Sequence, residues 1–396
     1  MKITKLEDLH ADAGWRTLSF LKVTTDEGVV GWAEYAEGFG AGGVSDLLRR
    51  FAPLVIGMDP RAVGKITSTL QAITRLAAGG LNNQAIAAIE NACLDIKAKA
   101  LGVPVCALFG GPFREKLDLY WSHCGSFRVR FPDMFENFGR PRIETLDDLT
   151  KLAKEAVARG FSAVKTNPLS VVDGKLKMFE GGFRPHPGLL ERNIDGAFVA
   201  SIKDMLAACR EGLGPTPGLM LDINFNQRTE GFLRVARAIE PFDLTWFEID
   251  THDAAALATV RQNARTPIAS LESIHGLRAY RDYFERGAVD VAVVDVLWNG
   301  LWESARIATL ADAYEVNCAP HNFYGDLATL MSAHFCAAIP NFRIMEIEVD
   351  DVPWKSDLVT APPVIENGRL TVPTTPGWGA DVNEEAVRAH PPKKRG

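Results

Sequence analysis

The sequence predicts an α/β fold: a closed (β/α)8-type barrel with an α+β module covering one side. The first observation behind this prediction is a spacing. Between Gly218 and Glu346 a short apolar run ends in a polar, chemically capable residue about every 25 positions, the length that one strand, one helix and two loops require. The second is the length of 396 residues, which suits a barrel with a further layer better than one small domain.

The N-terminal part of the chain predicts the α+β module. Two β-rich runs within residues 1–34 flank a Thr-Asp-Glu-Gly turn. Helical periodicity follows from about residue 57 and stops at Gly102 and Pro104, which commonly end helices. Strands followed by helices indicate a separate α+β layer.

The helix before Gly102 carries Asn91, Asp95 and Lys99 at four-residue spacing, so these side chains share one face, which we expect to be solvated or to face the barrel. Two short extended segments close to the C-terminus are expected to rejoin the N-terminal module. The domain boundaries that follow are 1–115, completed by about 355–396, for the module and 116–354 for the barrel.

The first two barrel strands carry three candidate site residues. The segment LDLYWSH ends at His123, for which we expect a structural or substrate-contacting role. FSAVK leads into Lys165 and Asn167, which alternation places on the same side of the strand. A lysine at a strand end is ordinarily a surface residue, but its position beside the carboxylates described below favours a catalytic role.

Residues 168–192 form a polar, Gly/Pro-punctuated, aperiodic insertion. A loop of this length inside a compact domain is typically a functional lid or disordered. Within it, Arg184 and His186 are candidates for contact with an anionic substrate.

Three carboxylates end three successive predicted strands: Asp222, Glu248 and Glu272. The C-terminal ends of barrel strands meet at one mouth, so these side chains are expected to converge. Three hard oxygen ligands without Cys or His favour Mg²⁺, or Mn²⁺, over Zn²⁺. Asn224 lies two residues past Asp222 on the same side and is expected to hydrogen-bond the metal ligands or the substrate.

The next strands end in an acid/base pair and a further carboxylate. Asp295 and His321 end two neighbouring strands, and an Asp held against one imidazole nitrogen raises the basicity of the other. Glu346, on the last strand, is expected to hydrogen-bond charge developing on the substrate. Together these residues suit one kind of reaction, in which the metal holds a substrate carboxylate, the His removes the α-proton, and the metal with Lys165 stabilises the enediolate.

The composition excludes several other classes of protein. The formal charge of -7, from 43 basic and 50 acidic residues, gives no support for nucleic-acid binding. Six cysteines without a CxxC pair indicate reduced thiols in a cytoplasmic enzyme. We expect no signal peptide and no membrane span. The expected partners are a small anionic substrate and other copies of the chain in a homo-oligomer.

Motifs in fixed order along nearly the whole chain show a family resemblance. They are TDEGVVGWAE, AIAAIENACLDIKAKALGVPVCALFGG, VKTN, LDINFN, WFEID, SLES, VVDVLWNG, APH, IME and PGWGADV. With these motifs the chain resembles the mandelate racemase subgroup of the enolase superfamily.

The resemblance implies a modified (β/α)7β barrel with an α+β capping domain built from both chain ends. It also implies that Asp222, Glu248 and Glu272 bind Mg²⁺, that His321 with Asp295 is the acid/base dyad, and that Glu346 hydrogen-bonds the intermediate. Capping-domain loops, including residues 34–44, would shape specificity.

One departure from the family pattern directs the functional hypothesis. The second-strand motif is usually Lys-x-Lys, whose second lysine is a base on the face opposite the histidine, but here it is Lys165-Thr166-Asn167. A Lys-x-Asn version resembles acid-sugar dehydratases of the galactonate type. Those carry a His two residues beyond the first metal ligand, where this chain has Asn224.

We therefore hypothesise an Mg²⁺-dependent hydro-lyase that dehydrates an aldonate or aldarate to a 2-keto-3-deoxy acid. His321 would abstract the C2 proton, protonate the departing C3 hydroxyl, or do both, and Asn167 would bind a hydroxyl or carboxylate oxygen. The alternatives are a racemase, epimerase or cycloisomerase acting through the same enediolate, and a metal-containing scaffold without catalytic function.

Overall fold

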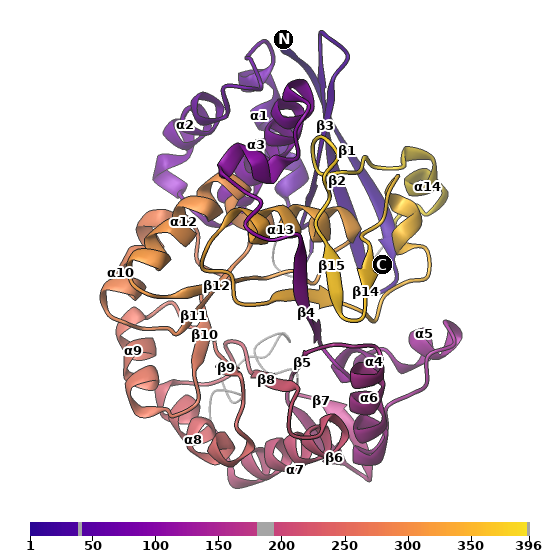
Figure 1. Ribbon diagram of the computed structural model, residues 1–396, viewed down its shortest axis with the longest axis vertical. Helices are drawn as coiled ribbons and strands as arrows, with labels where there is room; N and C mark the ends of the chain where they lie inside the picture. The colour runs from indigo at the N-terminus through magenta and orange to yellow at the C-terminus, as the bar shows by residue number, and fades with distance from the viewer. Residues whose placement is uncertain (39–41, 180–193, 394–396) are drawn as a thin grey trace.

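A computed structural model of the chain describes residues 1–38, 42–179 and 194–393. Within these ranges, eight parallel strands form a ring (Figure 1). Its first and last strands pair directly, and Cys318 closes the remaining gap through backbone hydrogen bonds with Asn341 and Arg343. In chain order the strands are β4 (Lys116–Ser122), β5 (Ala163–Thr166), β8 (Gly218–Asp222), β9 (Trp246–Glu248), β10 (Ile268–Ser270), β11 (Val291–Val294), β12 (Asn317–Pro320) and β13 (Met345–Glu348).

Helices follow each of the first seven ring strands and cover the outside of the barrel (Figure 1). The last ring strand, β13, is not followed by such a helix, so the predicted modified (β/α)7β barrel is confirmed. The helices are α4 (Ser126–Arg130), α5 (Pro132–Asn137), α6 (Leu146–Ala158), α7 (Gly196–Leu213), α8 (Thr229–Ile239), α9 (Ala254–Asn263), α10 (Leu277–Glu285), α11 (Val296–Asn299), α12 (Leu301–Ala313) and α13 (Asp326–Ala338).

The barrel interior is packed with side chains. Tyr120, Met220 and Trp246 belong to a buried apolar cluster contributed by the ring strands, and the rings of Tyr120 and Trp246 meet edge to face with centroids 5.5 Å apart. This layer lies beneath the mouth, as is usual for such barrels. It gives the polar side chains at the strand ends a rigid apolar floor.

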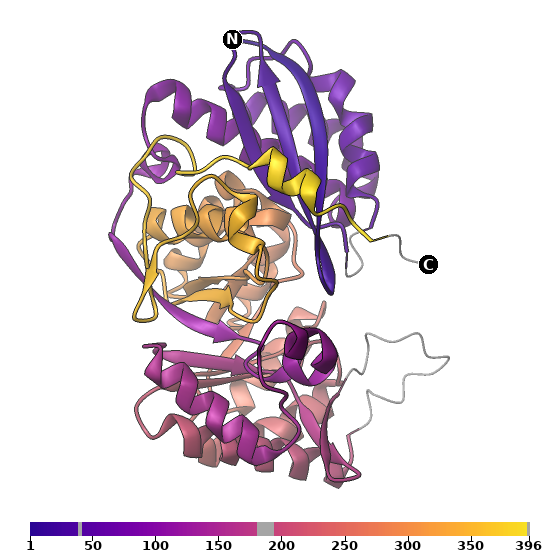
Figure 2. The same cartoon turned by 90° about the vertical axis from the view of Figure 1, so that its right-hand side faces the viewer.

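The N-terminal chain forms the predicted α+β capping domain. Its three strands make an antiparallel meander in the order β1-β2-β3, and three helices pack beside it (Figures 1 and 2). The elements are β1 (Ile3–Ala13), β2 (Arg16–Thr25), β3 (Val30–Tyr35), α1 (Val44–Val55), α2 (Val63–Thr74) and α3 (Gly80–Leu101).

The C-terminal segment runs from the barrel back to the cap (Figure 2). Two extended segments after Asn367 were expected to rejoin the N-terminal module. The first forms β15 (Arg369–Thr371), which pairs antiparallel with β14 (Ile365–Glu366) and with barrel strand β4, so for this segment the prediction is wrong. The residues beyond them do reach the cap: Trp378 donates from its indole to the Trp32 carbonyl, and helix α14 (Glu384–Ala389) packs on β1. The precise domain boundaries stay a prediction.

Side chains of the cap satisfy the ends of barrel helices. Asn91 donates to the Val296 carbonyl and accepts from the Leu301 N–H, so it is buried at the junction and is not solvated. The Glu34 carboxylate accepts from the Gly325 and Ala328 N–H groups at the start of α13, at 2.7 and 3.0 Å. Orphan N–H groups at a helix start need such acceptors, so these contacts fix the cap on the barrel.

The insertion after Pro168 is partly regular. Residues predicted to be an aperiodic loop form an antiparallel hairpin, β6 (Leu169–Val172) with β7 (Lys175–Met178). The candidates Arg184 and His186 lie outside the described residues, as does part of the loop 34–44. In the described part of the chain no helix is long and apolar enough to cross a membrane.

Candidate active site

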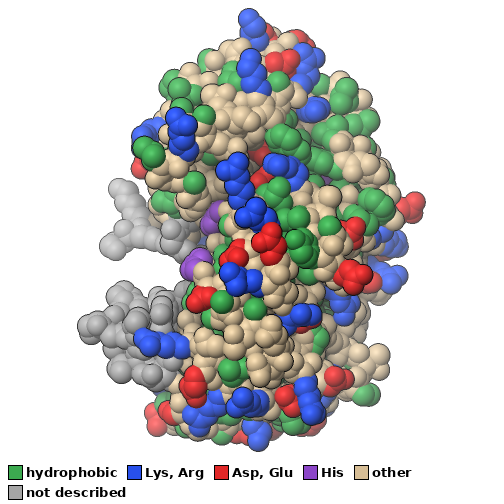
Figure 3. All heavy atoms as spheres, turned by 90° about the vertical axis from the view of Figure 1, so that its left-hand side faces the viewer, with side chains coloured by type: hydrophobic (Ala, Val, Ile, Leu, Met, Phe, Trp, Pro, Cys, Tyr) green, Lys and Arg blue, Asp and Glu red, His purple; other side chains and the backbone are tan. Residues whose placement is uncertain are grey.

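The predicted site residues come together at the C-terminal ends of the ring strands. Figure 3 shows histidine side chains in the hollow between the upper and lower parts of the molecule. Almost all of these residues are buried: Lys165, Asn167, Asp222, Glu248, Asp295, His321 and Glu346. Two strand ends differ from the prediction. β10 ends at Ser270, two residues before Glu272, and β13 continues past Glu346 to Glu348.

Lys165 lies between two carboxylates. Its Nζ is 3.0 Å from Glu248 Oε1 and 3.0 Å from Glu346 Oε1. Burial opposes the ammonium form, but the charges of Glu248 and Glu346 outweigh it and raise the pKa of Lys165 well above its ordinary value. With Glu248 and Glu346 in contact, Lys165 is thus favoured as a positive charge in this site.

The three predicted metal ligands carry charge that the fold only partly compensates. Burial raises the pKa of Asp222 to about 6, against the pull of Lys165 and with a further rise from Glu272. Burial likewise raises the pKa of Glu248 to about 7, again against Lys165, and burial and Glu248 raise that of Glu272, although His321 lowers it. Each group is thus disfavoured as an anion by lost water and by its neighbours.

A fourth carboxylate, Asp250, belongs to this group and was missed from the sequence. It is 2% exposed, and among the described residues neither of its oxygens has a hydrogen-bond donor. Burial raises its pKa well above the ordinary value, with further rises from Glu272, Asp222 and Glu248, and the Glu272 carboxyl lies within hydrogen-bonding reach. Two carboxyl groups can share such a contact only through a proton or a cation.

The donor chemistry of this cluster fits a hard divalent cation. The fit rests on buried, mutually repelling carboxylates and on the two unpartnered oxygens of Asp250. As the side chains stand, no three His, Cys, Asp or Glu groups of the described residues surround a common point. Glu248 instead contacts Lys165 and the Trp246 indole, so binding an ion requires it to exchange partners.

The predicted dyad has a direct contact. His321 Nδ1 lies 2.6 Å from Asp295 Oδ2, and Asp295 is held by the Tyr324 hydroxyl at 2.7 Å and by the Trp298 N–H at 2.8 Å. The other ring nitrogen, Nε2, lies 3.5 Å from Glu272. Burial lowers the pKa of His321, but Glu272 and Asp295 raise it to about 10.

The two predicted asparagines, Asn167 and Asn224, both contact Asp222. The Asn167 amide donates to the Asp222 carbonyl at 3.3 Å, and its oxygen accepts from the Ser126 hydroxyl at 2.9 Å. Asn224 donates to Asp222 from its backbone at 2.8 Å and from its side chain at 3.0 Å. Both therefore orient Asp222, which for Asn224 is one of its two predicted roles.

Glu346 connects Lys165 to the first strand. It accepts hydrogen bonds from the Ser122 hydroxyl and from the Asn322 N–H, the latter at 2.7 Å. Burial raises its pKa, but Lys165 and His321 outweigh burial and lower it to about 2. Glu346 is thus an ionised acceptor in this arrangement.

His123 lies beside Ser122, at the end of β4. Its Nδ1 is 2.8 Å from Glu348 Oε2 and 3.2 Å from the Ser122 hydroxyl. Its ring stacks on Phe127 with centroids 4.0 Å apart. Glu348 was not considered from the sequence because the last strand was predicted to end two residues earlier.

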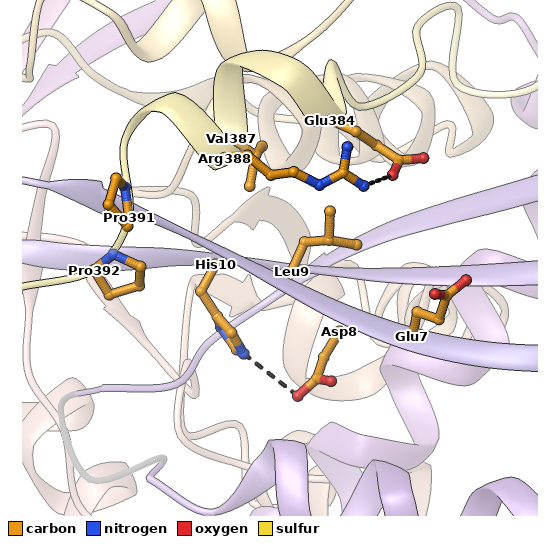
Figure 4. A pocket seen from close by; sticks show the side chains of 9 residues that line it. All are labelled: Glu7, Asp8, Leu9, His10, Glu384, Val387, Arg388, Pro391 and Pro392. Carbon is orange, nitrogen blue, oxygen red and sulfur yellow. Dashed lines mark hydrogen bonds and ion pairs between the residues drawn. The ribbon is translucent and has the colours of Figure 1, made fainter.

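A cavity lies elsewhere, between β1 and the C-terminal segment (Figure 4). It has a volume of about 420 Å³ and is lined by charged groups that are already paired: Arg388 with Glu384, and His10 with Asp8. No buried polar group there lacks a partner among the described residues. The converging, unsatisfied groups are at the barrel mouth, which we take as the active site.

Comparisons with known proteins agree with the fold. Residues 148–386 match the family described as Enolase C-terminal domain-like, and residues 12–110 match the N-terminal domain of the mandelate racemase / muconate lactonizing enzyme family. The chain is 28% identical to a D-xylonate dehydratase of Haloferax volcanii, over 98% of this chain and 89% of that protein. It is also 28% identical to a D-galactonate dehydratase of Ralstonia nicotianae, over 98% and 94%.

A solved structure is more similar in sequence. It is a provisionally named L-alanine-DL-glutamate epimerase from Burkholderia xenovorans strain LB400, 43% identical, with a TM-score of 0.96 and all of both chains covered. A second structure of that protein, bound to magnesium and fumarate, has a TM-score of 0.95 and covers 100% of this chain and 97% of that one.

Proposed function

The chain belongs to the mandelate racemase / muconate lactonizing enzyme family of the enolase superfamily, and from this premise we propose that it is an Mg²⁺-dependent dehydratase of an acid sugar. The product would be a 2-keto-3-deoxy acid formed from an aldonate or aldarate. Relatives named D-xylonate and D-galactonate dehydratase support this substrate class. A cytoplasmic location and a homo-oligomeric state belong to the same proposal.

The observation that carries the proposal is the asymmetry of the mouth. One side presents the His321–Asp295 dyad. On the other, Lys165 is held as an ammonium between Glu248 and Glu346, and the following site position is Asn167, which cannot accept a proton. Racemisation needs a competent base on each face of the substrate, whereas dehydration begins with one.

Asp222, Glu248 and Glu272 would hold Mg²⁺, and the ion would supply Lewis-acid stabilisation of negative charge on the substrate and would offset the effect of Glu272 on His321. His321 Nε2 would then take the C2 proton, while Asp295 holds Nδ1 and stabilises the imidazolium that forms. Lys165 would neutralise charge growing on the carboxylate oxygens. Asn167 would donate to a substrate oxygen without transferring a proton.

The test is to incubate the protein with Mg²⁺ and a panel of aldonic and aldaric acids and to detect 2-keto acid. We expect product from at least one acid, and a loss of about 10²–10⁴-fold in His321→Asn, the usual contribution of a positioned base. His10→Gln is the matched control, because His10 also pairs with a carboxylate but lies outside the barrel. Epimerised substrate without keto acid from any member of the panel would refute the proposal.

The second candidate is an epimerase acting through the same enediolate. The name of the 43% identical Burkholderia protein supports it. Deuterium uptake at C2 without loss of water, accompanied by inversion at that carbon, would identify this activity.

A further inference from the structure

A second histidine–carboxylate pair lies at the barrel mouth, close to the first. His123 Nδ1 contacts Glu348 at 2.8 Å, as His321 Nδ1 contacts Asp295 at 2.6 Å. The two rings have centres 5.8 and 5.0 Å from that of Phe323, so they lie within 11 Å of each other. Both imidazoles are thus held by Nδ1, which leaves Nε2 of each for other partners.

His123 is placed to meet a ligand in the mouth. Its side chain keeps 15% of its exposed surface while Glu348 is fully covered. Among the described residues, Nε2 has no hydrogen-bond partner, and it is not one of the fully covered polar atoms. The backbone of His123 has φ of 49°, an uncommon conformation for a residue with a side chain, of the kind that gathers at functional sites.

Burial around His123 and Glu348 acts on where this pair holds its proton. Burial lowers the pKa of His123 to about 3, against the pull of Glu346, with Lys165, His321 and Arg16 as the other charged groups that act on it. Burial raises the pKa of Glu348 well above its ordinary value, as do Asp350 and Asp351, against Arg16. Both directions favour a neutral imidazole and a protonated carboxyl group in the His123–Glu348 pair.

The hydrogen bonds of Glu348 indicate where its proton lies. Oε1 accepts from the Asp350 N–H at 3.1 Å, so Oε2 is the oxygen left to donate, and it faces His123 Nδ1. An imidazole that accepts at Nδ1 carries its own proton on Nε2. The pair then presents an N–H toward the mouth, with a replacement proton directly behind it.

We propose that His123, supplied by Glu348, is the proton donor to the leaving hydroxyl in the dehydration, an assignment that rests on the proposed function. His321 takes the C2 proton, and the C2–H electron pair forms the enediolate. The C3–O bond then breaks with its electron pair, and the oxygen takes the Nε2 proton of His123 and leaves as water. At the same time Nδ1 takes the Glu348 proton, so the imidazole stays neutral and Glu348 becomes a carboxylate.

The electron pair that the C2–H bond gave to the enediolate then forms the C2=C3 bond of an enol. Protonation of C3 converts this enol into the ketone. The imidazolium of His321 holds the proton that this last step needs. A base and an acid held in one site are a usual arrangement for such a reaction.

The decisive variant is Glu348→Gln. Its amide donates to His123 Nδ1 as the protonated carboxyl group does, but it has no proton to pass on. In D₂O with Mg²⁺ and an acid sugar that the protein dehydrates, we expect deuterium exchange at C2 to stay within about twofold of the wild type. Formation of keto acid should fall about 10²-fold or more, the usual contribution of a general acid. His123→Gln should behave in the same way, and His10→Gln should leave both rates unchanged.

Two outcomes would overturn the proposal. Equal losses of exchange and of dehydration in Glu348→Gln would make the pair a positioning element. Unchanged dehydration in both variants would exclude a role in proton transfer. Thermal unfolding of each variant separates either result from a failure to fold.

A separate measurement covers the case in which no acid sugar is dehydrated and the proposed function itself fails. Nitrogen-15 NMR of the histidine rings of the full-length protein reports the proton positions directly. We expect His123 to be a neutral Nε2–H tautomer from pH 5 to 8. A positively charged ring or an Nδ1–H tautomer at pH 7 would refute the relay whatever the substrate.

Discussion

Two groups of buried carboxylates differ in what compensates them. At the junction between cap and barrel, Glu34 accepts from two backbone N–H groups at the start of α13, and Glu90 accepts from the Trp302 N–H in the first turn of α12. At the mouth, Glu248 depends on the Lys165 ammonium, and Asp250 has no donor. Both groups are buried to a similar degree.

The difference lies in the permanence of the partners. Backbone N–H groups at a helix start are fixed by the fold, and the helix dipole adds to their attraction for a carboxylate. The mouth carboxylates face side chains that can turn away, and they repel one another. The junction carboxylates thus have fixed donors, whereas under the proposed function a cation and an anionic substrate would complete the mouth.

The largest expected effect is on catalysis and comes from the mouth. Glu248→Gln should weaken Mg²⁺ binding and lower dehydration by about 10³-fold or more, because a bound metal supplies several kcal/mol to such a transition state. Glu90→Gln keeps an acceptor for Trp302 and should bind Mg²⁺ as the wild type does. Calorimetric titration with Mg²⁺ and keto-acid formation measure both. Equal loss in the two variants would remove the distinction between the groups.

The second effect is the pH dependence of stability at the junction. Burial raises the pKa of Glu90 to about 8 from an ordinary 4.5, so the folded state favours the protonated form. Its contribution is complete below about pH 4.5 and is lost as the pH rises to about 8, at up to about 1.4 kcal/mol per pH unit. The free energy of unfolding of the wild type, relative to Glu90→Gln, should therefore fall across this window. Urea unfolding at several pH values measures it, and a parallel course of the two proteins would contradict it.

The carboxylates at the mouth and those at the junction also differ in how well the sequence predicted them. Asp222 and Glu248 end strands as predicted, because their strands are short apolar runs that a carboxylate terminates. Glu272 lies beyond its strand, since the chain turns at Leu271, whose φ is 94°. No local pattern marks such a turn at a leucine.

The residues that the sequence did not reveal act over long separations. Glu34 meets the start of α13 almost 300 positions later, and Asp250 matters because Glu272 arrives from the next strand. His123 was identified as a candidate, but its partner Glu348 was not, because nothing local shows that β13 continues past Glu346. The hairpin after Pro168 was missed because each of its strands has only four residues, which is too short for a pattern of alternation to stand out.

A third effect tests the junction by removing an acceptor. Glu34→Ala leaves the Gly325 and Ala328 N–H groups without their acceptor in a buried place, which should cost about 1–3 kcal/mol. Asp8→Ala, a change on the outer face of the cap, is the control and should cost little. Urea unfolding at pH 6 compares them. A cost for Glu34→Ala no larger than that of the control would show that the fold does not depend on this cap.

The smallest expected effect distinguishes the two groups of carboxylates most directly. One substitution at the mouth should stabilise the metal-free protein and at the same time weaken Mg²⁺ binding. Asp250→Asn removes a buried carboxyl group that burial and the neighbouring carboxylates disfavour as an anion, so the metal-free protein should become more stable, by about 1 kcal/mol. The same change should weaken Mg²⁺ binding about tenfold, as the loss of a group next to metal ligands commonly does. Thermal unfolding in EDTA and in excess Mg²⁺ gives both numbers. If Asp250→Asn destabilised the protein in EDTA, Asp250 would have a compensating partner in the folded chain, and the mouth would resemble the junction after all.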